Sequence, residues 1–583
     1  MTPRERIFAY MRQVRGQFIV GAILTVLYAI FFQLVPVAVR ELVGRIEDGR
    51  PMEAITQTVW FLIAVSTSFA VLRLFSRLLI FRAGREIEFR LRNDLFAHLQ
   101  RLPQSYFAGQ RTGDLMSRAV NDINNVRMFL GAGVLNVVQT PVLYLGAIGV
   151  MAWVDPQLTL FVLLPYPLFI LAARYFGRLM HAASLATQEQ LGTLSAMVQE
   201  NAAGVFVVRA YTMEEHERER FAAENQALYA RQITLAKTSG GMHATITPLP
   251  TLAMIIVLAA GGARVLAGSL EQRDLWLFLM YAFQLTHPTF SLGWVINMLQ
   301  RGLVGLRRLG EILDTVPTIA DRPDRVDRDE LEGQVVVRDL EFSYPVRQRR
   351  PALVGVSFRV EPGQTVGVVG PVGAGKSTLI SAIPRLLEIR DGSVQIDGID
   401  VNRLPIQLLR SSIAMVPQDS FLFSTTLLEN IRFGRPDASL DEVREAARRA
   451  HVLADIEEFP QGFDTPVGER GITLSGGQRQ RICLARALLL DPAILILDDA
   501  LSSVDAATEE AILKELRGAR AGRTCFIVAH RISAVRDADF TVVLEEGRVV
   551  AIGSHDELLR EEGLYARISR QQTLQSEIEE EIA

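Results

Sequence analysis

The chain carries Gly370-Pro371-Val372-Gly373-Ala374-Gly375-Lys376-Ser377-Thr378 between an apolar run, Thr365–Val369, and a helical pattern that starts at Leu379. Strand, glycine-rich loop and helix in this order predict a phosphate-binding loop for ATP. The glycines let backbone N–H groups point at the β- and γ-phosphates, the lysine neutralises them, and the serine offers a hydroxyl to Mg²⁺. An ordinary glycine-rich turn is the alternative. It is disfavoured because one of only three lysines in the chain occupies the lysine position.

A second apolar run, Ala493–Leu497, ends in two carboxylates, Asp498 and Asp499. A carboxylate at the carboxyl end of a strand can hold Mg²⁺ through water beside a phosphate loop. Apolar strands that end in aspartate are common, so this feature is weak by itself. Together with the phosphate loop, it predicts an α/β domain with an ATP and Mg²⁺ site.

Between these two motifs lies Leu474-Ser475-Gly476-Gly477-Gln478, which opens a helical run. A serine–glycine cap on an ordinary helix would show the same local pattern. The order of the three motifs, however, resembles the ATP-binding-cassette transporters, specifically exporters with six helices followed by one cassette. The resemblance implies that this signature loop contacts the γ-phosphate of ATP held by the other cassette of a head-to-tail dimer. A helix N-terminus presented to an anion gives that contact a physical basis.

The resemblance also assigns roles to four positions elsewhere in the cassette. Tyr344 matches the aromatic residue that stacks on adenine, and His530 matches the switch histidine that hydrogen-bonds the γ-phosphate. Gln418 matches the residue that senses Mg²⁺ and faces the membrane domain, and Asp505 lies in the loop that crosses the dimer interface. Taken singly, a core tyrosine, a loop glutamine or a hydrogen-bonded histidine is the simpler interpretation. The order and spacing of all four favour the functional one.

One position departs from the family pattern. Members with full hydrolytic activity usually carry glutamate where this chain has Asp499, and that glutamate polarises the attacking water. Aspartate reaches ~1.5 Å less far, and misplacements near 1 Å can cost ~10²-fold in rate. The site built on Lys376 is therefore expected to bind ATP well and to hydrolyse it slowly.

The signature loop, by contrast, is intact, and this asymmetry predicts a heterodimer. The expected partner is a second half-transporter that has glutamate after its own Mg²⁺ aspartate. The overall likeness is to the heterodimeric bacterial multidrug exporters of the TmrAB kind, on the degenerate-site side. The resemblance spans nearly the whole chain.

The first half of the sequence has the composition of a membrane domain. Hydrophobic residues make up 49% of the chain, and the net charge of −4 argues against a nucleic-acid-binding protein. Crossing a bilayer core of ~30 Å takes ~20 mostly apolar helical residues. Six segments qualify: Phe18–Val39, Ala54–Phe81, Met128–Val154, Leu158–Ala173, Met242–Ala263 and Leu275–Leu299.

The connections between these segments predict the topology. Two long, arginine-rich stretches, residues 82–127 and 174–237, are expected to be helices that continue beyond the membrane. The positive-inside rule places both stretches, and the cassette, on the cytoplasmic side of the membrane. The expected location is the cytoplasmic (inner) membrane. Near the two tips, Ser105–Asp114 and Ala203–Tyr211 resemble the coupling segments of the family. Simple helix kinks are the alternative.

These observations predict a multidomain membrane protein. An all-α six-helix transmembrane domain is expected at 1–310, a linker at 311–333, an α/β P-loop cassette at 334–570 and an acidic tail at 571–583. The expected function is ATP-driven export of hydrophobic or amphipathic substrates, with drugs, lipids and peptides all open. The alternatives are a homodimeric lipid flippase and a membrane-anchored ATP switch that transports nothing.

Polar residues within the spans have two interpretations. They either line a translocation path or hydrogen-bond neighbouring helices. The residues concerned are Gln33, Asn136, Gln139, Gln284, His287 and Asn297. The only cysteines, Cys483 and Cys525, are far apart in the sequence and predict neither a disulfide framework nor a metal site.

Overall fold

The computed structural model describes residues 2–344, 351–468, 471, 473–518 and 523–582. The chain divides into two compact units, one formed by Met1–Phe96 and Leu115–Asp314 and the other by Ala97–Asp114 and Thr315–Ala583. The described part of the first unit is helical, and all the described strands belong to the second. This division agrees with the predicted fold class of a helical domain plus an α/β domain.

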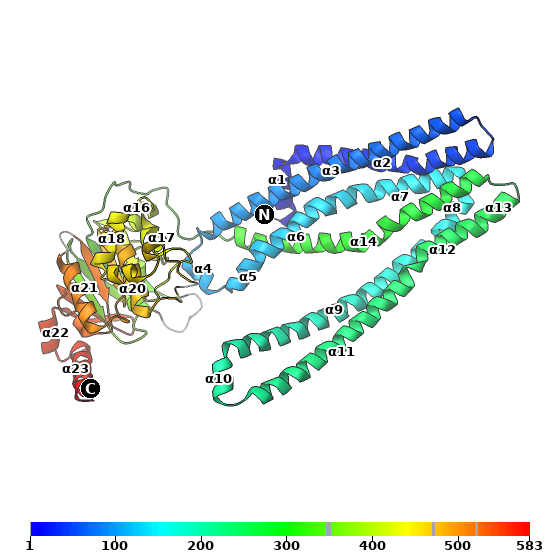
Figure 1. Cartoon of the computed structure of the whole chain (residues 1–583). Coiled ribbons are helices and arrows are strands. Elements are labelled where there is room, and N and C mark those ends of the chain that lie inside the picture. The colour runs from blue at the N-terminus through cyan, green and yellow to red at the C-terminus, as the bar shows by residue number, and fades with distance from the viewer. Residues whose placement is uncertain (1, 345–350, 469–470, 472, 519–522, 583) are drawn as a thin grey trace. The chain divides into compact units, whose positions relative to one another are not determined.

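Six long helices dominate the first unit (Figure 1). They are α2 (Arg15–Glu47), α3 (Met52–Leu99), α7 (Val134–Val154), α9 (Pro165–Ala203), α11 (Glu214–Ile246) and α14 (Gln272–Leu313). Shorter helices begin the chain or join and extend these: α1 (Pro3–Gln13), α5 (Thr112–Ser117), α6 (Ile123–Met128), α8 (Pro156–Leu163), α10 (Val205–Ala210), α12 (Pro248–Ile256) and α13 (Gly262–Leu266). Three π-helical turns continue them at η1 (Arg118–Asp122), η2 (Phe129–Gly133) and η3 (Val257–Gly261).

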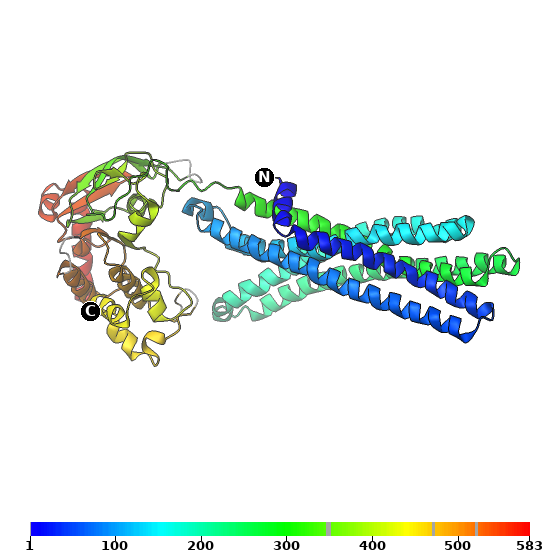
Figure 2. The ribbon, with the colours of Figure 1, turned by 90° about the horizontal axis from the view of Figure 1, so that it is seen from above.

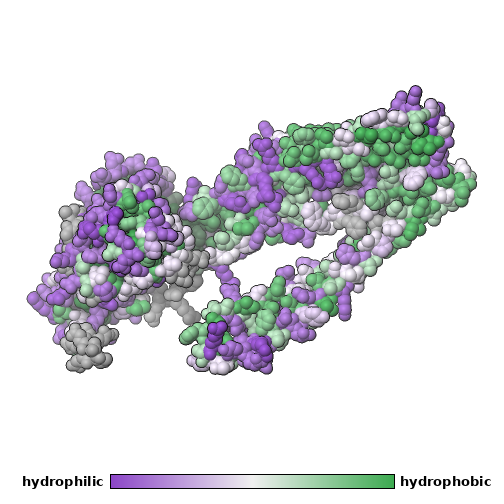
Figure 3. Space-filling view, in the orientation of Figure 1, coloured by the Kyte–Doolittle hydropathy of each residue, from purple (hydrophilic) through white to green (hydrophobic). Residues whose placement is uncertain are grey.

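Five helical stretches among the described residues are long and apolar enough to cross a membrane. They are Arg15–Glu47, Met52–Leu99, Thr112–Val154, Pro156–Ala203 and Glu214–Leu266, and each contains one predicted segment. The sixth predicted segment lies in α14, which is 42 residues long but is not among the five, and polar Gln284, Thr286 and Thr289 interrupt its apolar run. Figure 3 shows a hydrophobic face over α2 and α3 with hydrophilic residues at both ends, as lipid contact requires.

Polar side chains join the helices of this unit. Gln33 on α2 donates from Nε2 to the Leu143 carbonyl of α7 at 2.6 Å, and the Tyr281 hydroxyl of α14 donates to the Gln33 carbonyl at 2.7 Å. Asn136 donates to Ala132 in its own helix at 2.8 Å. Gln33 therefore bonds neighbouring helices, as one of the two interpretations expects. The side chain of His287 lies outside the described residues.

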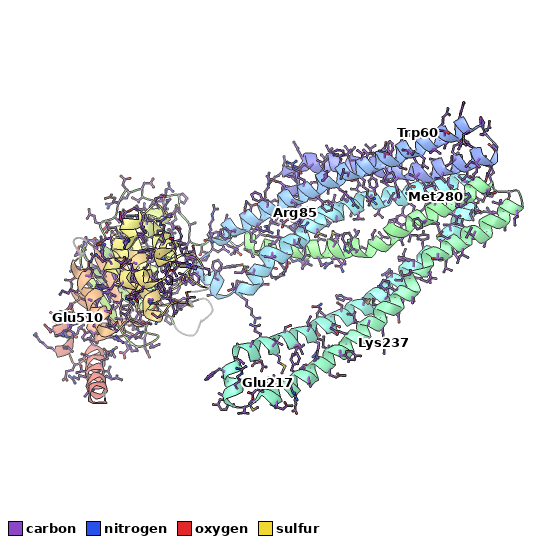
Figure 4. The ribbon with its side chains drawn as sticks, viewed as in Figure 1. Trp60, Arg85, Glu217, Lys237, Met280 and Glu510 are labelled. Carbon is purple, nitrogen blue, oxygen red and sulfur yellow. The ribbon has the colours of Figure 1, made fainter. Side chains whose placement is uncertain are left out.

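Helices α9 and α11 leave the bundle as a two-helix arm that α10 closes at its tip (Figures 1 and 4). The two helices hold each other through polar contacts. Gln190 donates to the Glu224 carboxylate at 2.6 Å, and Asn201 donates to the carboxylate of Glu217, labelled in Figure 4, at 2.7 Å. The tip carries large exposed hydrophobic side chains, with Phe206 82% exposed. This tip, Ala203–Tyr211, is the second predicted coupling segment, whereas the first, Ser105–Asp114, lies in the stretch Ala97–Asp114 that groups with the cassette unit. That first segment contains α4 (Gln104–Ala108).

The α/β unit is built on a six-stranded sheet with strand order β10-β9-β3-β8-β7-β6. Its strands are β3 (Thr365–Val369), β6 (Ile413–Val416), β7 (Ile494–Asp498), β8 (Thr524–Val528), β9 (Phe540–Glu545) and β10 (Arg548–Gly553). Every residue of β3, β7 and β8 is buried, as expected for parallel strands covered on both faces. A second, antiparallel sheet has the order β2-β1-β4-β5 and consists of β1 (Val335–Phe342), β2 (Leu353–Val360), β4 (Val394–Ile396) and β5 (Ile399–Asp400).

Helices lie beside the strands of this unit (Figure 2). They are α15 (Lys376–Ala382), α16 (Ile406–Ser411), α17 (Leu427–Ile431), α18 (Leu440–Arg449), α19 (Leu453–Glu458), α20 (Gly476–Leu489), α21 (Ala506–Gly518), α22 (His555–Arg560) and α23 (Leu564–Ile582), with short 3₁₀ turns at η4 (Arg432–Gly434), η5 (Gly462–Asp464) and η7 (Ile532–Ala534). One hydrophobic core joins α18 and α20 to β7, and another lies between the two sheets. Cys483 and Cys525 are both buried thiols.

Candidate ATP-binding and hydrolysis site

Strand register gathers the predicted residues at one edge of the sheet. Strand β7 ends at Asp498, which pairs with Val528 of β8, and Val416 of β6 pairs with Leu497 of β7. Strand β3 runs parallel to β8 and ends at Val369, directly before the phosphate loop. Because parallel strands end at the same edge, the residues that follow these strands meet there. They are the loop Gly370–Thr378, Asp499, His530 and Gln418.

The phosphate loop has a shape that only glycine allows at two positions. Gly375 has a φ of +96°, and a Cβ there would lie 2.5 Å from the Ala352 carbonyl oxygen. At Gly370 a Cβ would lie 2.1 Å from the Leu544 carbonyl oxygen. Because a side chain would clash at both positions, the loop backbone there carries none, and its N–H groups can face an anion.

Lys376 is held at the mouth of this loop. Its Nζ donates to the Gly370 carbonyl at 2.8 Å and to the Pro371 carbonyl at 3.1 Å. Burial lowers the pKa of the ammonium group, while the nearby carboxylates of Asp498 and Asp499 oppose that shift. A partly desolvated cation in this position attracts phosphate oxygens more strongly than a solvated one would.

Asp498 and Ser377 fit a Mg²⁺ ion. The Asp498 side chain is buried, and burial raises its pKa, which the hydrogen bond from Ser377 partly offsets. A hydroxyl and a carboxylate are the hard oxygen donors that Mg²⁺ prefers. Among the described residues, no cluster of three or more His, Cys, Asp or Glu is arranged to hold a metal. Phosphate oxygens and water would therefore complete the coordination shell.

Asp499 adopts a left-handed backbone conformation with a φ of +49°, uncommon for a residue with a side chain. Its N–H donates to the Val528 carbonyl of β8 at 2.9 Å, and its carbonyl accepts from the Ser502 hydroxyl at 3.0 Å. With His530 and Glu509 it lines a cavity of about 90 Å³. The structure thus brings Asp499 and His530 to one cavity.

Tyr344 and Gln418 are two further predicted residues of this site. The Tyr344 hydroxyl lies 3.2 Å from Thr378 Oγ1, so the ring is tied to the helix that follows the phosphate loop. Its ring also packs edge-on against Phe342, with centroids 4.9 Å apart. Gln418 follows β6 by two residues and is exposed, free to face a ligand or another domain.

The signature loop caps helix α20. The Ser475 hydroxyl accepts from Gln478 N–H at 3.2 Å, and the Gln478 side chain accepts from Ser475 N–H at 3.1 Å, which forms a complete capping box. A Cβ on Gly477 would lie 2.9 Å from the Ser503 carbonyl oxygen, and one on Gly476 would lie 3.2 Å from Ser503 Cβ. The two glycines therefore pack the loop against the segment Ser502–Asp505.

Asp505 ends that segment as the cap of α21. Its carboxylate accepts from Thr508 N–H at 2.9 Å, and this bond lowers the pKa of Asp505. The cap fixes where the segment leaves the sheet.

Three further residues around the site, Gln480, Glu509 and Arg531, belong to none of the motifs that the sequence analysis used. Buried Gln480 on α20 donates to Ser502 Oγ at 3.0 Å and accepts from Ser503 N–H at 2.9 Å. Glu509 pairs with Arg531 at 3.0 Å, directly beside His530. Sequence reasoning missed them because their partners lie 20 or more residues away and only the tertiary fold brings them together.

Comparisons with known proteins match two family models, the ABC transporter transmembrane region over residues 18–289 and the ABC transporter domain over residues 353–502. The multidrug resistance-like ATP-binding protein MdlA of Escherichia coli strain K12 is 35% identical over 99% of this chain and 98% of its own. The ATP-dependent lipid A-core flippase of Syntrophus aciditrophicus strain SB is 35% identical over 87% of this chain and 84% of its own.

The structure is also similar to a solved one, a bacterial Atm1-family ABC exporter with ATP bound. The TM-score is 0.79 with 28% sequence identity, over 97% of this chain and 99% of that one. The likeness covers both units, so it confirms the predicted fold class. The chain therefore belongs to the ABC transporter family as an exporter half-transporter, a multi-pass membrane protein whose cassette couples ATP hydrolysis to transport.

Proposed function

We propose that this chain is the degenerate-site half of a heterodimeric exporter for hydrophobic or amphipathic molecules. The observation that carries the proposal is Asp499 at the end of β7, in a chain whose signature loop, Ser475–Gln478, is complete. The site on this chain would hold ATP between the Lys376 loop and the partner's signature loop. This chain's own signature loop would complete the partner's site, where most hydrolysis takes place.

Different residues around the phosphate loop bind the adenine, the phosphates and Mg²⁺. Tyr344 stacks on adenine, Lys376 and the loop N–H groups bind the phosphates, and Ser377 with Asp498 positions Mg²⁺. When bound, the metal neutralises the β- and γ-phosphate oxygens. His530 and Gln418 contact the γ-phosphate side, while Asp499 orients water less well than glutamate would.

The arm of α9 and α11 supports a dimer. Its tip exposes Val205, Phe206, Val207 and Tyr211, a cluster of apolar side chains unlike the surface of a solvated helix. Exposed apolar clusters of this kind mark interaction sites. Both coupling segments, the arm tip and Ser105–Asp114, would then transmit cassette closure to the membrane helices.

Two bound ATP molecules would draw the cassettes together, and hydrolysis at the partner's site would release them. A ligand shifts such an equilibrium only through its different affinity for the two states. The closed dimer must therefore bind ATP more tightly than ADP. His530, at the γ-phosphate, is one residue that can make this distinction.

The cargo class rests on the relatives. One is described as multidrug resistance-like and another as a lipid A-core flippase. Both descriptions fit cargo that enters from the membrane. The second relative also favours the alternative function, a homodimeric lipid flippase, in which Asp499 would serve as the working base.

Transport is tested in inside-out membrane vesicles with MgATP supplied in the outside medium, which the cassettes then face. Uptake of a hydrophobic cationic dye, or movement of a fluorescent phospholipid between leaflets, should require ATP and disappear in Lys376→Ala vesicles. Added substrate should also stimulate ATP hydrolysis. ATP binding without uptake of either probe, and without stimulated hydrolysis, would instead support the membrane-anchored ATP switch.

A further inference from the structure

The C-terminal helix α23 is firmly docked on the cassette over its first turns. Tyr565 and Ala566 are each only 1% exposed, and Tyr565 packs into the core that also holds β7 and α20. The Tyr565 hydroxyl lies 2.8 Å from His555 Nδ1, which ties α23 to α22. Gln572 follows Tyr565 by seven residues, about two helical turns, so both side chains lie on the same face of α23.

Gln572 holds the segment that carries the switch histidine by two hydrogen bonds. Its Nε2 donates to the His530 carbonyl at 2.5 Å, and its Oε1 accepts from Ile532 N–H at 2.9 Å. A neutral amide supplies one donor and one acceptor at the same time, which neither a carboxylate nor an ammonium group can do. The side chain therefore fixes the backbone on both sides of Arg531.

Hydrophobic packing also holds this segment, because Ala529 and Ile532 are buried in the same core. Ala529 N–H donates to the Val368 carbonyl of β3 at 3.3 Å, which is a long bond. Arg531 pairs with Glu509 at 3.0 Å, but the Arg531 side chain is half-exposed. The His530 side chain itself is exposed, so its direction depends on how well its own backbone is held.

We propose that Gln572 is a positioning residue for the switch: by fixing the His530 and Ile532 backbone it presents the His530 imidazole to the γ-phosphate. Through this residue, helix α23 sets how strongly the cassette prefers ATP over ADP. The inference rests on the proposed contact between His530 and the γ-phosphate. It adds a control point at the end of the chain, outside the phosphate and signature loops.

The test measures nucleotide preference on this chain within its natural assembly. The complex purified from membranes is incubated with photoreactive 8-azido-ATP and increasing concentrations of MgATP or MgADP as competitors. The probe is then cross-linked by light, the subunits are separated, and the label on this chain is measured. Gln572→Leu removes both hydrogen bonds, so the ATP-to-ADP preference of this chain should fall about 3- to 10-fold. The affinity for ADP, which lacks the γ-phosphate, should stay within about two-fold of the original.

Three variants test whether a change in the ATP-to-ADP preference comes from the hydrogen bonds of Gln572 or from a general disturbance of α23. Gln571→Leu, at the exposed neighbouring position, should leave the preference unchanged. Gln572→Glu keeps the acceptor for Ile532 N–H but loses the donor to His530, so its loss should be as large as that of Gln572→Leu or slightly smaller. Removal of residues 574–583 leaves Gln572 in place and should have no effect.

His530→Ala separates the two ways of failing. If His530→Ala leaves the ATP-to-ADP preference unchanged, the proposed role of the histidine is wrong. If His530→Ala lowers the preference while both Gln572 variants keep it, the positioning role of Gln572 is overturned. An equal loss of ATP and ADP affinity in Gln572→Glu would also overturn it, because only the γ-phosphate contact should change.

Discussion

The two half-sites that this chain offers to ATP differ in their completeness. The signature half, Ser475–Gln478 at the start of α20, has every expected residue and a full capping box. The phosphate half has its glycines, its lysine and Asp498 in place, but Asp499 is one methylene shorter than glutamate. In a head-to-tail dimer the two halves serve different ATP molecules. Damage to one half should therefore affect a different nucleotide from damage to the other.

The largest expected effect is on the signature half. Ser475→Arg would place a long cationic side chain where the loop N–H groups face the partner's γ-phosphate. ATP turnover of the purified complex should fall about 10²-fold or more. Ser439→Arg is the matched control, because Ser439 forms the same kind of capping box at the start of α18, outside the signature loop. Turnover that survives Ser475→Arg would show that this loop does not complete a working site.

The next largest effect is on the phosphate half. Asp499→Glu restores the reach of the side chain and should speed hydrolysis at this chain's own site about 10- to 10²-fold. Nucleotide cross-linked to this chain after a short incubation should be mainly ATP in the original protein and mainly ADP in the variant. If the original protein already yields ADP at the rate of the variant, the site is not degenerate.

These two half-sites also show what sequence can reveal. Strands β3 and β7 were predictable because a strand buried on both faces is a continuous apolar run. The phosphate loop and the cap of α20 were predictable because short motifs specify local backbone geometry. The contacts of Gln480, Glu509 and Gln572 were not, since each depends on how distant segments pack. The roles of Tyr344, Gln418 and His530 stay predictions that rest on family resemblance, and the domain limits near residues 310 and 571 stay predictions as well.

A smaller effect is expected on adenine binding at the phosphate half-site. Tyr344→Ala removes the ring expected to stack on the base, and ATP binding on this chain should weaken about ten-fold. Tyr344→Phe keeps the ring and loses only the contact with Thr378, so binding should change by less than about three-fold. Competition with 8-azido-ATP measures both. Equal losses in the two variants would mean that the hydroxyl, rather than the ring, binds the nucleotide.

The smallest expected effect is on stability. Burial raises the pKa of Asp498, so the native state favours the protonated acid. Its contribution to stability is present at pH values below its unfolded pKa of ~3.9 and is lost as the pH rises through the raised native value. At pH 7 Asp498→Asn should therefore raise the melting temperature of the nucleotide-free protein by about 2–4 °C, and the difference should shrink at acidic pH. A lower melting temperature at pH 7 would contradict this.

The most direct test of the asymmetric composite site starts from the complex purified through a tag on this chain. The mass of the intact complex is measured by mass spectrometry, and its ATP turnover is compared with that of this chain expressed alone. We expect an equimolar complex with a second half-transporter that carries glutamate after its Mg²⁺ aspartate, and ATP turnover at least ten-fold faster than that of this chain alone. A dimer of two identical copies with the same turnover would contradict it.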